Sequence, residues 1–335
     1  MIKKKQISAS VLAVDIGGTK ILLALFAASG EMLVKNIHPT LAAEGVNAVT
    51  ARLCSAIANI LKQNKMRPLQ LGGIGIACAG GIDTGRGLVV TPAPQLPGWV
   101  DIPLAEIVRK RFDIPAFVVN DASAAALGEH RYGAGRGVKN LVLLTLGTGI
   151  GGGIIADNKL YLGDVGAAGE LGHMTIDADG PACGCGNRGC LEMLASGTAV
   201  AGDALKRIRQ GHKSALSEMA GGKIENISAE MVGAAARNGD TLAGEVIARA
   251  AYYLGVGLVN MVNIFNPEMI VIGGGMAGLG DLLIEPGKRL VAERAFPISS
   301  RAVRIVAAEL GNEAGVYGAA AFALEKIRGG QDEGT

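Results

Sequence analysis

Four residues of the types that bind zinc lie within one short stretch of this chain. They are His173, Cys183, Cys185 and Cys190, with glycines between the cysteines. Thiolate and imidazole groups suit a tetrahedral zinc ion, and Cys-x-Cys followed by a third cysteine lets one loop wrap the ion. Four protein ligands leave no coordination position open, so the sequence predicts a structural zinc site. The alternative is three reduced cysteines and a core histidine.

Carboxylates stand on both sides of this stretch, and two more end apolar runs. Glu170 and Glu192 flank the predicted zinc loop, where each could bind two neighbouring hydroxyls of a sugar; this residue type is also common on protein surfaces. Asp121 follows the apolar run 115–119 and could accept the proton of an attacking alcohol, or cap the helix that begins there. Asp15 could position magnesium through water, or form an Asx turn.

Glycine-rich loops join apolar runs at two places. Residues 17–19, Gly-Gly-Thr, lie between apolar runs at 11–15 and 21–27. Glycine lets backbone N–H groups approach an anion, and threonine adds a hydroxyl donor; taken alone, the pattern fits a plain glycine turn equally well. The pattern returns between residues 140 and 155 around Gly-Thr-Gly at 147–149. We therefore expect a duplicated fold whose two loops clamp a polyphosphate across a cleft.

Apolar runs and helical periodicity predict the elements that hold these residues. Strands are predicted at 11–15, 21–27, 71–77, 115–119 and 269–275, and on both sides of the loop 147–149. Helices are predicted at 46–65, 104–112, 122–127, 196–209, 228–238, 242–265 and 314–327. We expect Gly255 and Gly257 to permit close helix packing, the insertion 210–227 to be polar and exposed, and the tail 328–335 to be disordered.

The composition limits the class of protein. With 335 residues, 49% of them hydrophobic, and a mean hydropathy of +0.35, the chain can form two domains with large aliphatic cores. The net charge of +2 offers no basic stripe for nucleic acid, and Lys3-Lys4-Lys5 is interpreted as a solvated N-terminus. We find neither a secretion signal nor an apolar run of the roughly 18 residues that a membrane helix needs, so we expect a cytoplasmic protein. Five cysteines, an odd number, favour metal over a disulfide framework.

Together these residues resemble the ROK family (repressor, open reading frame, kinase) of the actin-like sugar kinase ATPases. The resemblance runs from Val11 to about Leu324, and its most specific part is Gly172-His173 followed by Cys183-Gly-Cys-Gly-Asn-Arg-Gly-Cys-Leu-Glu192. It implies two α/β domains of ribonuclease H-like type with a cleft between them. The first domain would comprise residues 1–120 and the C-terminal helix at about 314–328; the second, 121–313, would carry the zinc loop 173–190.

The resemblance also implies a role for each candidate residue. Asp121 would be the general base, and His173 would serve zinc through one ring nitrogen and sugar through the other. The residues around the sugar would be Gly81, Asn120, Gly149, Glu170, His173 and Glu192. Those around ATP and its magnesium would be Asp15, Gly17, Gly18, Thr19, Lys20, Gly147, Thr148, Gly149, Gly273, Gly274 and Gly275.

The reaction implied by the resemblance is transfer of the ATP γ-phosphoryl group to the 6-hydroxyl of glucose. Residues 96–99 and 192–198 resemble the branch of the family that phosphorylates glucose. Ile82 departs from animal N-acetylmannosamine kinases, which have a basic residue there, whereas Gln95 stands where many members of the glucose branch have Asn. N-acetylmannosamine and N-acetylglucosamine stay as alternative substrates, and polyphosphate as an alternative donor.

A protein of a different class is the second alternative. The family also contains sugar-responsive repressors, with a helix-turn-helix domain before the first phosphate loop, and only ten residues precede Val11 here. Repressors often lose the phosphate loop or the base, and this chain keeps both. A catalytically silent sugar sensor would be distinguished by a phosphotransfer assay. The resemblance further implies a homodimer.

Overall fold

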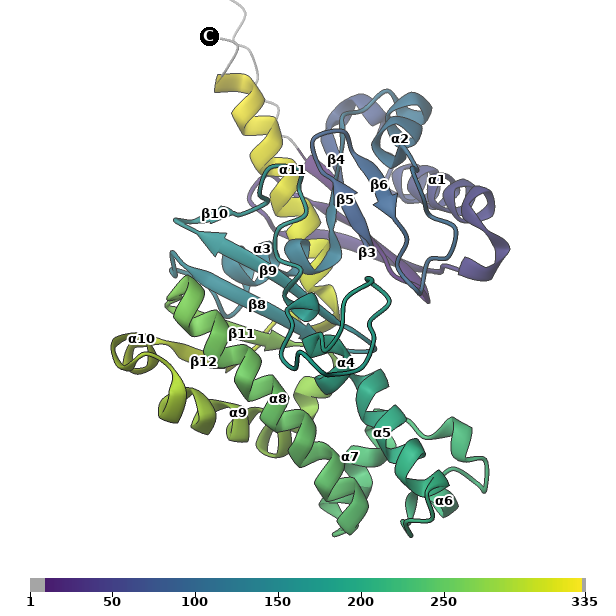
Figure 1. The fold of residues 1–335 in the computed structure, drawn as a ribbon. Helices are drawn as coiled ribbons and strands as arrows, with labels where there is room; N and C mark the ends of the chain where they lie inside the picture. Colours follow the sequence, from purple (N-terminus) through teal and green to yellow (C-terminus); the bar gives the residue numbers. More distant parts are fainter. Residues whose placement is uncertain (1–9, 333–335) are drawn as a thin grey trace, which may run out of the picture.

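The structure, a computed structural model, describes residues 10–332 of the chain, so the predictions for Lys3-Lys4-Lys5 and for residues 333–335 lie outside it. Two five-stranded sheets repeat one arrangement, in the orders β3-β2-β1-β4-β7 and β10-β9-β8-β11-β12 (Figure 1). In each sheet three antiparallel strands continue into two parallel ones. The prediction of a duplicated unit is confirmed by this shared topology.

The strands have the following bounds. The first sheet contains β1 (Ser10–Ile16), β2 (Lys20–Phe26), β3 (Met32–Pro39), β4 (Leu71–Cys78) and β7 (Ala116–Asn120). The second contains β8 (Leu141–Leu146), β9 (Ile150–Ala156), β10 (Lys159–Leu160), β11 (Met269–Gly273) and β12 (Arg304–Ala307). A separate hairpin is formed by β5 (Gly81–Asp83) and β6 (Leu88–Thr91).

Helices cover the faces of both sheets (Figure 1). They are α1 (Val46–Gln63), α2 (Leu104–Phe112), α3 (Asp121–Tyr132), α4 (Leu191–Ala195), α5 (Gly197–Arg209), α6 (Leu216–Met219), α7 (Ala229–Arg237), α8 (Thr241–Phe265), α9 (Gly280–Arg294), α10 (Pro297–Ala302) and α11 (Ala314–Asp332). By length and composition alone α8 could cross a membrane, but 61% of its most apolar window is buried inside the protein, as expected of a core helix.

Strand β1 shows why the central strands are apolar at every position. Leu12 and Val14 belong to the core that includes α1, whereas Val11 and Ala13 belong to the core that includes α11. Because successive side chains of a strand point to opposite faces, a strand covered on both faces has no solvent-facing position. The continuous apolar run of residues 11–14 is the consequence.

Helices α3 and α11 cross in close contact at the junction of the two sheets. Helix α3 packs on β8 and β9, and α11 packs on β1 and β4. A Cβ at Gly318 would overlap the carbonyl oxygen of Ala124, and one at Gly128 would overlap that of Ala314. Glycine at both positions therefore lets the two backbones touch. The N-terminus of α3, where Asp121 lies, is thus fixed relative to both sheets.

Several sequence-based expectations need correction. Helix α11 continues to Asp332, so residues 328–332 are helical rather than disordered. The insertion 210–227 contains a short helix, α6, whose Leu216 is fully buried, so this segment is not simply exposed. Strands β3 and β12 and helix α9 were not predicted. The close packing expected of Gly255 and Gly257 is confirmed, since Cβ atoms there would lie 2.9 Å and 2.8 Å from Leu290 and Leu191 side-chain carbons.

Candidate active site

A cleft of about 2430 Å³ collects most of the candidate residues. It is lined by both glycine hairpin loops, by the ends of β4 and β7, and by the cysteine-containing loop. The predicted residues among its walls are Gly18, Thr19, Gly81, Asn120, Asp121, Gly147, Thr148, Gly149, Glu170, His173, Cys183, Cys185, Glu192 and Gly274. Six others are not among its lining residues: Asp15, Gly17, Lys20, Cys190, Gly273 and Gly275.

The two hairpin loops present only some of their backbone N–H groups to the cleft. The N–H of Gly17 donates to the Lys20 carbonyl at 3.0 Å, and the N–H of Gly147 donates to the Gly149 carbonyl at 2.9 Å. These bonds close the turns, so neither N–H group is free for an anion. The N–H groups of Gly18, Thr148 and Gly149 stay as the candidate phosphate donors.

Two roles were considered for Asp121, the N-cap of the following helix and the acceptor of a proton, and the first of these belongs to Asn120. Asn120 is the N-cap of α3: its Oδ1 accepts from the N–H groups of Ala122 and Ser123 at 2.9 and 3.1 Å, and its Nδ2 donates to the Gly80 carbonyl at 3.1 Å. Asp121, the first helical residue, accepts a hydrogen bond from the N–H of Ala122 to Oδ1 at 2.9 Å. The capping alternative therefore belongs to Asn120, and Asp121 Oδ2 has no protein donor in the described chain.

Burial raises the pKa of the Asp121 carboxyl above its ordinary value, while its backbone hydrogen bonds act in the opposite direction. Asp15 is the last residue but one of strand β1, which is separated from β7 by β4. Burial has the largest effect on the pKa of Asp15, and the negative charge of Asp121 has the second largest. Together they raise the pKa of Asp15 to about 7, although Lys20 lowers it. The strands β1, β4 and β7 are parallel, so their carboxyl ends bring both acids to one sheet edge. A Cβ at Gly315 would lie 2.6 Å from Asp15 Oδ2, which places this acid at the N-terminus of α11.

Glu192 and Glu170 face the same part of the cleft. Oε2 of Glu192 accepts from the N–H of Ile150 at 2.9 Å, which ties α4 to the second hairpin. Burial raises the pKa of Glu170, His173 lowers it, and the charges of Asp121 and Glu192 raise it further. All three carboxylates are wall residues of the cleft. Gly81 is another wall residue of the cleft, and its N–H donates to Thr91 Oγ1 at 3.0 Å.

The four predicted zinc ligands converge in one cluster. One ligating atom from each of His173, Cys183, Cys185 and Cys190 lies within 4.8 Å of the other three. Cys185 Sγ and Cys190 Sγ are 3.7 Å apart, and Cys183 Sγ is 3.6 Å from His173 Nδ1. A tetrahedral zinc ion with Zn–S bonds of about 2.3 Å places its sulfur ligands about 3.8 Å apart, so the donor set and its spacing fit zinc.

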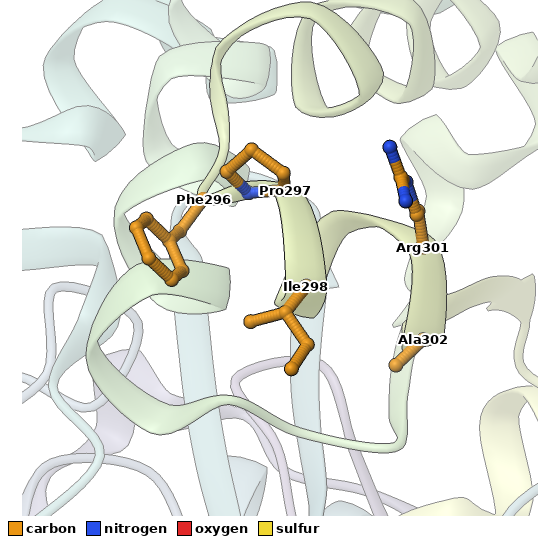
Figure 2. A pocket seen from close by; sticks show the side chains of 5 residues that line it. All are labelled: Phe296, Pro297, Ile298, Arg301 and Ala302. Carbon is orange, nitrogen blue, oxygen red and sulfur yellow. The ribbon is translucent and has the colours of Figure 1, made fainter.

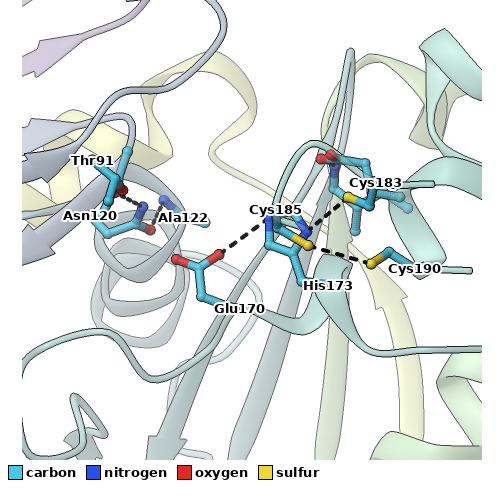
Figure 3. A network of polar contacts seen from close by, with 12 residues as sticks. Thr91, Asn120, Ala122, Glu170, His173, Cys183, Cys185 and Cys190 are labelled. Atoms are coloured by element: carbon cyan, nitrogen blue, oxygen red, sulfur yellow. Dashed lines mark hydrogen bonds and ion pairs between the residues drawn. The ribbon is translucent and has the colours of Figure 1, made fainter. Parts of the chain in front are cut away.

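The ring of His173 connects this cluster to the cleft. Its Nδ1 faces Cys183, whereas its Nε2 lies 4.0 Å from Glu170 Oε2. Figure 3 shows Glu170 between Asn120 and the cysteine cluster. One ring nitrogen is therefore placed for a metal and the other for the cleft. Cys190 is the N-cap of α4 and stands two residues before Glu192, so whatever holds the cluster also holds that carboxylate.

The third glycine loop contributes one residue to the cleft. Gly274 adopts a positive φ of 85°, and a Cβ there would overlap the Leu146 carbonyl at the end of β8.

Sequence reasoning missed several charged residues of the cleft wall, among them Arg188, Lys206 and Arg249. Lys206 and Arg249 lie on helices, where a charged residue usually marks only the solvent-facing side, so no local signal distinguished them.

A smaller hollow of about 580 Å³ lies at the α9–α10 junction, far from these residues in sequence (Figure 2). It is lined by Phe296, Pro297, Ile298, Arg301 and Ala302. No carboxylate, cysteine or histidine is among these five residues, so the hollow lacks the groups that the cleft brings together.

Comparison with known proteins identifies relatives over nearly the whole chain. The profile of the ROK family matches residues 11–326. A glucokinase of Halalkalibacterium halodurans is 38% identical over 308 residues, 92% of each chain. A xylose repressor of Caldicellulosiruptor bescii is 33% identical, over 95% of this chain and 79% of the repressor. The crystal structure of a ROK family glucokinase from Streptomyces griseus, in complex with glucose and AMPPNP, superposes with a TM-score of 0.79 at 35% identity, covering 95% of this chain and all of that one.

Proposed function

The chain belongs to the ROK family and has its actin-like ATPase fold, and we propose from this premise that it is an ATP-dependent glucokinase. The product would be glucose 6-phosphate and ADP. The observation that carries the proposal is the position of Asp121, which lines one cleft together with two glycine hairpin loops and two further carboxylates, Glu170 and Glu192. The residues proposed as general base, phosphate donors and hydroxyl ligands are thus all wall residues of one cavity.

Asp121 is the proposed general base. Its Oδ2 is free of protein donors in the described chain, and burial raises its proton affinity. The 6-hydroxyl of the sugar would donate to this oxygen and lose its proton to it as the O–P bond forms and the bond from the γ-phosphorus to the bridging oxygen of ADP breaks. Positioned proton transfer of this kind contributes about 10²–10⁴-fold to rate.

Glu170, Glu192 and His173 are proposed to hold the sugar ring. Each glutamate can accept hydrogen bonds from sugar hydroxyls, and Glu192 keeps Oε1 for this purpose because Oε2 is engaged by Ile150. The Nε2 atom of His173 faces the same space. Asn120 has one amide hydrogen left after its cap and its bond to Gly80, so its contribution is a single directed donor.

The hairpin loops are proposed to hold the triphosphate. The N–H groups of Gly18, Thr148 and Gly149 can donate to phosphate oxygens. Gly274 lies next to the second hairpin loop, against the Leu146 carbonyl. Asp15 would hold magnesium through water, and its surroundings fit, because a buried acid beside a second acid is stabilised as an anion by a cation. Bound magnesium would neutralise phosphate charge.

Zinc is proposed to be structural. It would be held by His173, Cys183, Cys185 and Cys190, and it would fix the loop that ends at Glu192. Its four protein ligands would complete the tetrahedral shell, so the ion would hold the loop in place and would not bind substrate.

Two alternatives are kept, each with an observation that bears on it. N-acetylmannosamine and N-acetylglucosamine are alternative acceptors because Gln95, a wall residue, stands close to the first loop and could contact either kind of sugar. A non-catalytic sensor is the alternative of a different class, in view of the similarity to a xylose repressor. The presence of Asp121 and of both hairpin loops in one cleft favours the kinase.

The test is an ADP-release assay with ATP and magnesium over glucose, mannose, N-acetylglucosamine, N-acetylmannosamine, fructose and allose. We expect the largest kcat/KM with glucose. A larger value with an acetamido sugar would replace the substrate assignment, and no turnover with any sugar would support the sensor. Repeating the assay with polyphosphate in place of ATP tests the donor. A cytoplasmic location and a homodimer are part of the proposal; light scattering of the purified protein tests the second.

A further inference from the structure

Each hairpin loop of the cleft has carbonyl oxygens bonded by a threonine from outside the loop. The hydroxyl of Thr40 donates to the Gly17 carbonyl at 2.6 Å, and its backbone N–H donates to the Thr19 carbonyl at 2.9 Å. Thr40 is fully buried and is not a wall residue of the cleft. It therefore reaches the first loop from behind.

The second loop is also bonded by a threonine, Thr198, although this residue is part of the cleft wall. The hydroxyl of Thr198 donates to the Thr148 carbonyl at 2.8 Å, and its N–H donates to the same oxygen at 3.3 Å. The preceding residue, Gly197, donates its N–H to the Gly147 carbonyl at 2.8 Å. These donors belong to the first turn of α5, whose N–H groups have no partner within the helix.

Because the peptide group is planar, a hydrogen bond that fixes a carbonyl also fixes the direction of the N–H that follows it. The C=O and the following N–H of a trans peptide lie in one plane and point in opposite directions, and no cis peptide occurs among the described residues. A fixed Gly17 carbonyl thus turns the Gly18 N–H away from Thr40. In the second loop, fixed carbonyls at 147 and 148 orient the N–H groups of Thr148 and Gly149. Those three residues are wall residues of the cleft.

Thr40 is itself supported by helix α1. The guanidinium of Arg52 donates to the Thr40 carbonyl at 2.6 Å and pairs with Glu44. Gly18 is confined from its other side by Gln95, whose Cβ would lie 2.5 Å from any Cβ at position 18. The first loop is thus fixed on both sides before any ligand arrives.

We propose that Thr40 and Thr198 are positioning residues that orient the N–H groups of the two hairpin loops toward the phosphates of the nucleotide. The proposal rests on the proposed kinase function and deepens it. An enzyme gains from donors that are oriented in advance, because they need no reorganisation when charge develops on the phosphoryl oxygens. Thr40 is not a wall residue and acts only through the loop peptides, whereas Thr198 is itself a wall residue of the cleft.

The decisive variant is Thr40→Val, which keeps the shape of the side chain and removes only the hydroxyl. Calorimetric titration with ATP and magnesium should give a Kd raised roughly 3- to 10-fold, since one net hydrogen bond is lost, while the Kd for glucose stays unchanged. Thr40→Ser, which restores the hydroxyl, should return the ATP Kd to the wild-type value. An unspecific loss of packing would not separate the two ligands in this way.

Thr50→Val is the matched control. Thr50 is also buried, and its hydroxyl donates to the Val46 carbonyl at 2.9 Å within α1, away from the loops. This variant should lose a comparable amount of stability with no change in either Kd. Equal ATP Kd values for folded Thr40→Val and Thr50→Val would overturn the proposal.

Thr198→Val gives a second test that does not depend on the folding of a core variant, because Thr198 is exposed at the start of α5. It should raise the ATP Kd without changing the glucose Kd, and an unchanged ATP Kd would contradict the proposal for the second loop. If the wild-type protein binds ATP but turns over no sugar, the kinase function fails while the effect of the threonines is still measured. If it binds no ATP, both proposals fail.

Discussion

The carboxylate of Glu192 lies directly against the backbone of Gly149. A Cβ at position 149 would overlap Glu192 Oε2, and the same oxygen accepts the N–H of Ile150 at 2.9 Å. The second hairpin loop is therefore in contact with Glu192, one of the residues proposed to bind the sugar. The glycine is required at this position because a carboxylate occupies the space of a side chain.

Gly149→Ala should displace Glu192 and raise the KM for glucose. The loss of a charge-assisted hydrogen bond predicts an increase of about 10- to 100-fold, larger than the change in the KM for ATP. Steady-state kinetics with each substrate varied measures both. Gly244→Ala is the control, because a Cβ there meets no atom within 4 Å. An unchanged glucose KM in Gly149→Ala would reject the proposed role of Glu192.

Asp15 predicts a pH-dependent stability of the ligand-free protein. Its pKa is raised from 3.8 to about 7 in the folded state, so the folded state binds the proton more tightly than the unfolded chain does. Stability should therefore fall as pH rises between these values. Asp15→Asn removes this penalty, so the gain in Tm should be larger at pH 8 than at pH 5. Calorimetric scans at the two values test it, and equal gains would contradict the assigned burial.

The raised pKa of Asp121 predicts how kcat/KM depends on pH on the acid side of the rate profile. A general base must be ionised, so kcat/KM should fall with decreasing pH and with an apparent pKa above the ordinary aspartate value of 3.8. Because the charge of Asp121 affects both Asp15 and Glu170, the apparent pKa in the rate profile belongs to the three coupled carboxyl groups rather than to one residue. Full activity below pH 4 would exclude a buried carboxylate as the base.

Metal analysis should find one zinc ion per chain. Cys185→Ser should lose most of the metal, lower the Tm and raise the glucose KM through Glu192, whereas Cys54→Ser, outside the cluster, should change none of these. Structural zinc contributes on the order of 10 kcal/mol in small domains, so the loss of Tm should be readily measured. Protein isolated without stoichiometric zinc would remove the metal from the account.

The sequence was most informative in the central strands and in the cysteine-containing loop, where the type and spacing of the residues match the structure they form. The central strands are covered on both faces, so their residues form continuous apolar runs and the strands could be predicted. The polar residues that follow these runs mark the carboxyl ends of the strands. The cysteine spacing identified a cluster that the structure brings together. The edge strand β3 was missed because its alternate residues Leu33 and Ile37 are exposed, 52% and 59%, so no polar face marks it. Helix α9 was missed because Pro286 and Gly287 interrupt its pattern.

The finer geometry of the site could not be read from residue types. Only the three-dimensional structure shows that Asn120 caps α3, so that Asp121 keeps one carboxylate oxygen without a protein donor in the described chain. It also shows that the N–H of Gly17 is bonded within the turn. Thr40 lies more than twenty positions from the loop that it holds, and nothing in its neighbourhood marks it. Long-range hydrogen bonds of this kind depend on tertiary packing, which local patterns do not encode.

The central claim is that Asp121 takes the proton of the sugar hydroxyl. The direct test is Asp121→Asn, which keeps the size of the side chain, measured by glucose calorimetry and by ADP release on the same preparation. We predict a glucose Kd within a few-fold of wild type and a kcat reduced about 10²–10⁴-fold. Turnover close to the wild-type rate, with glucose bound normally, would contradict the account.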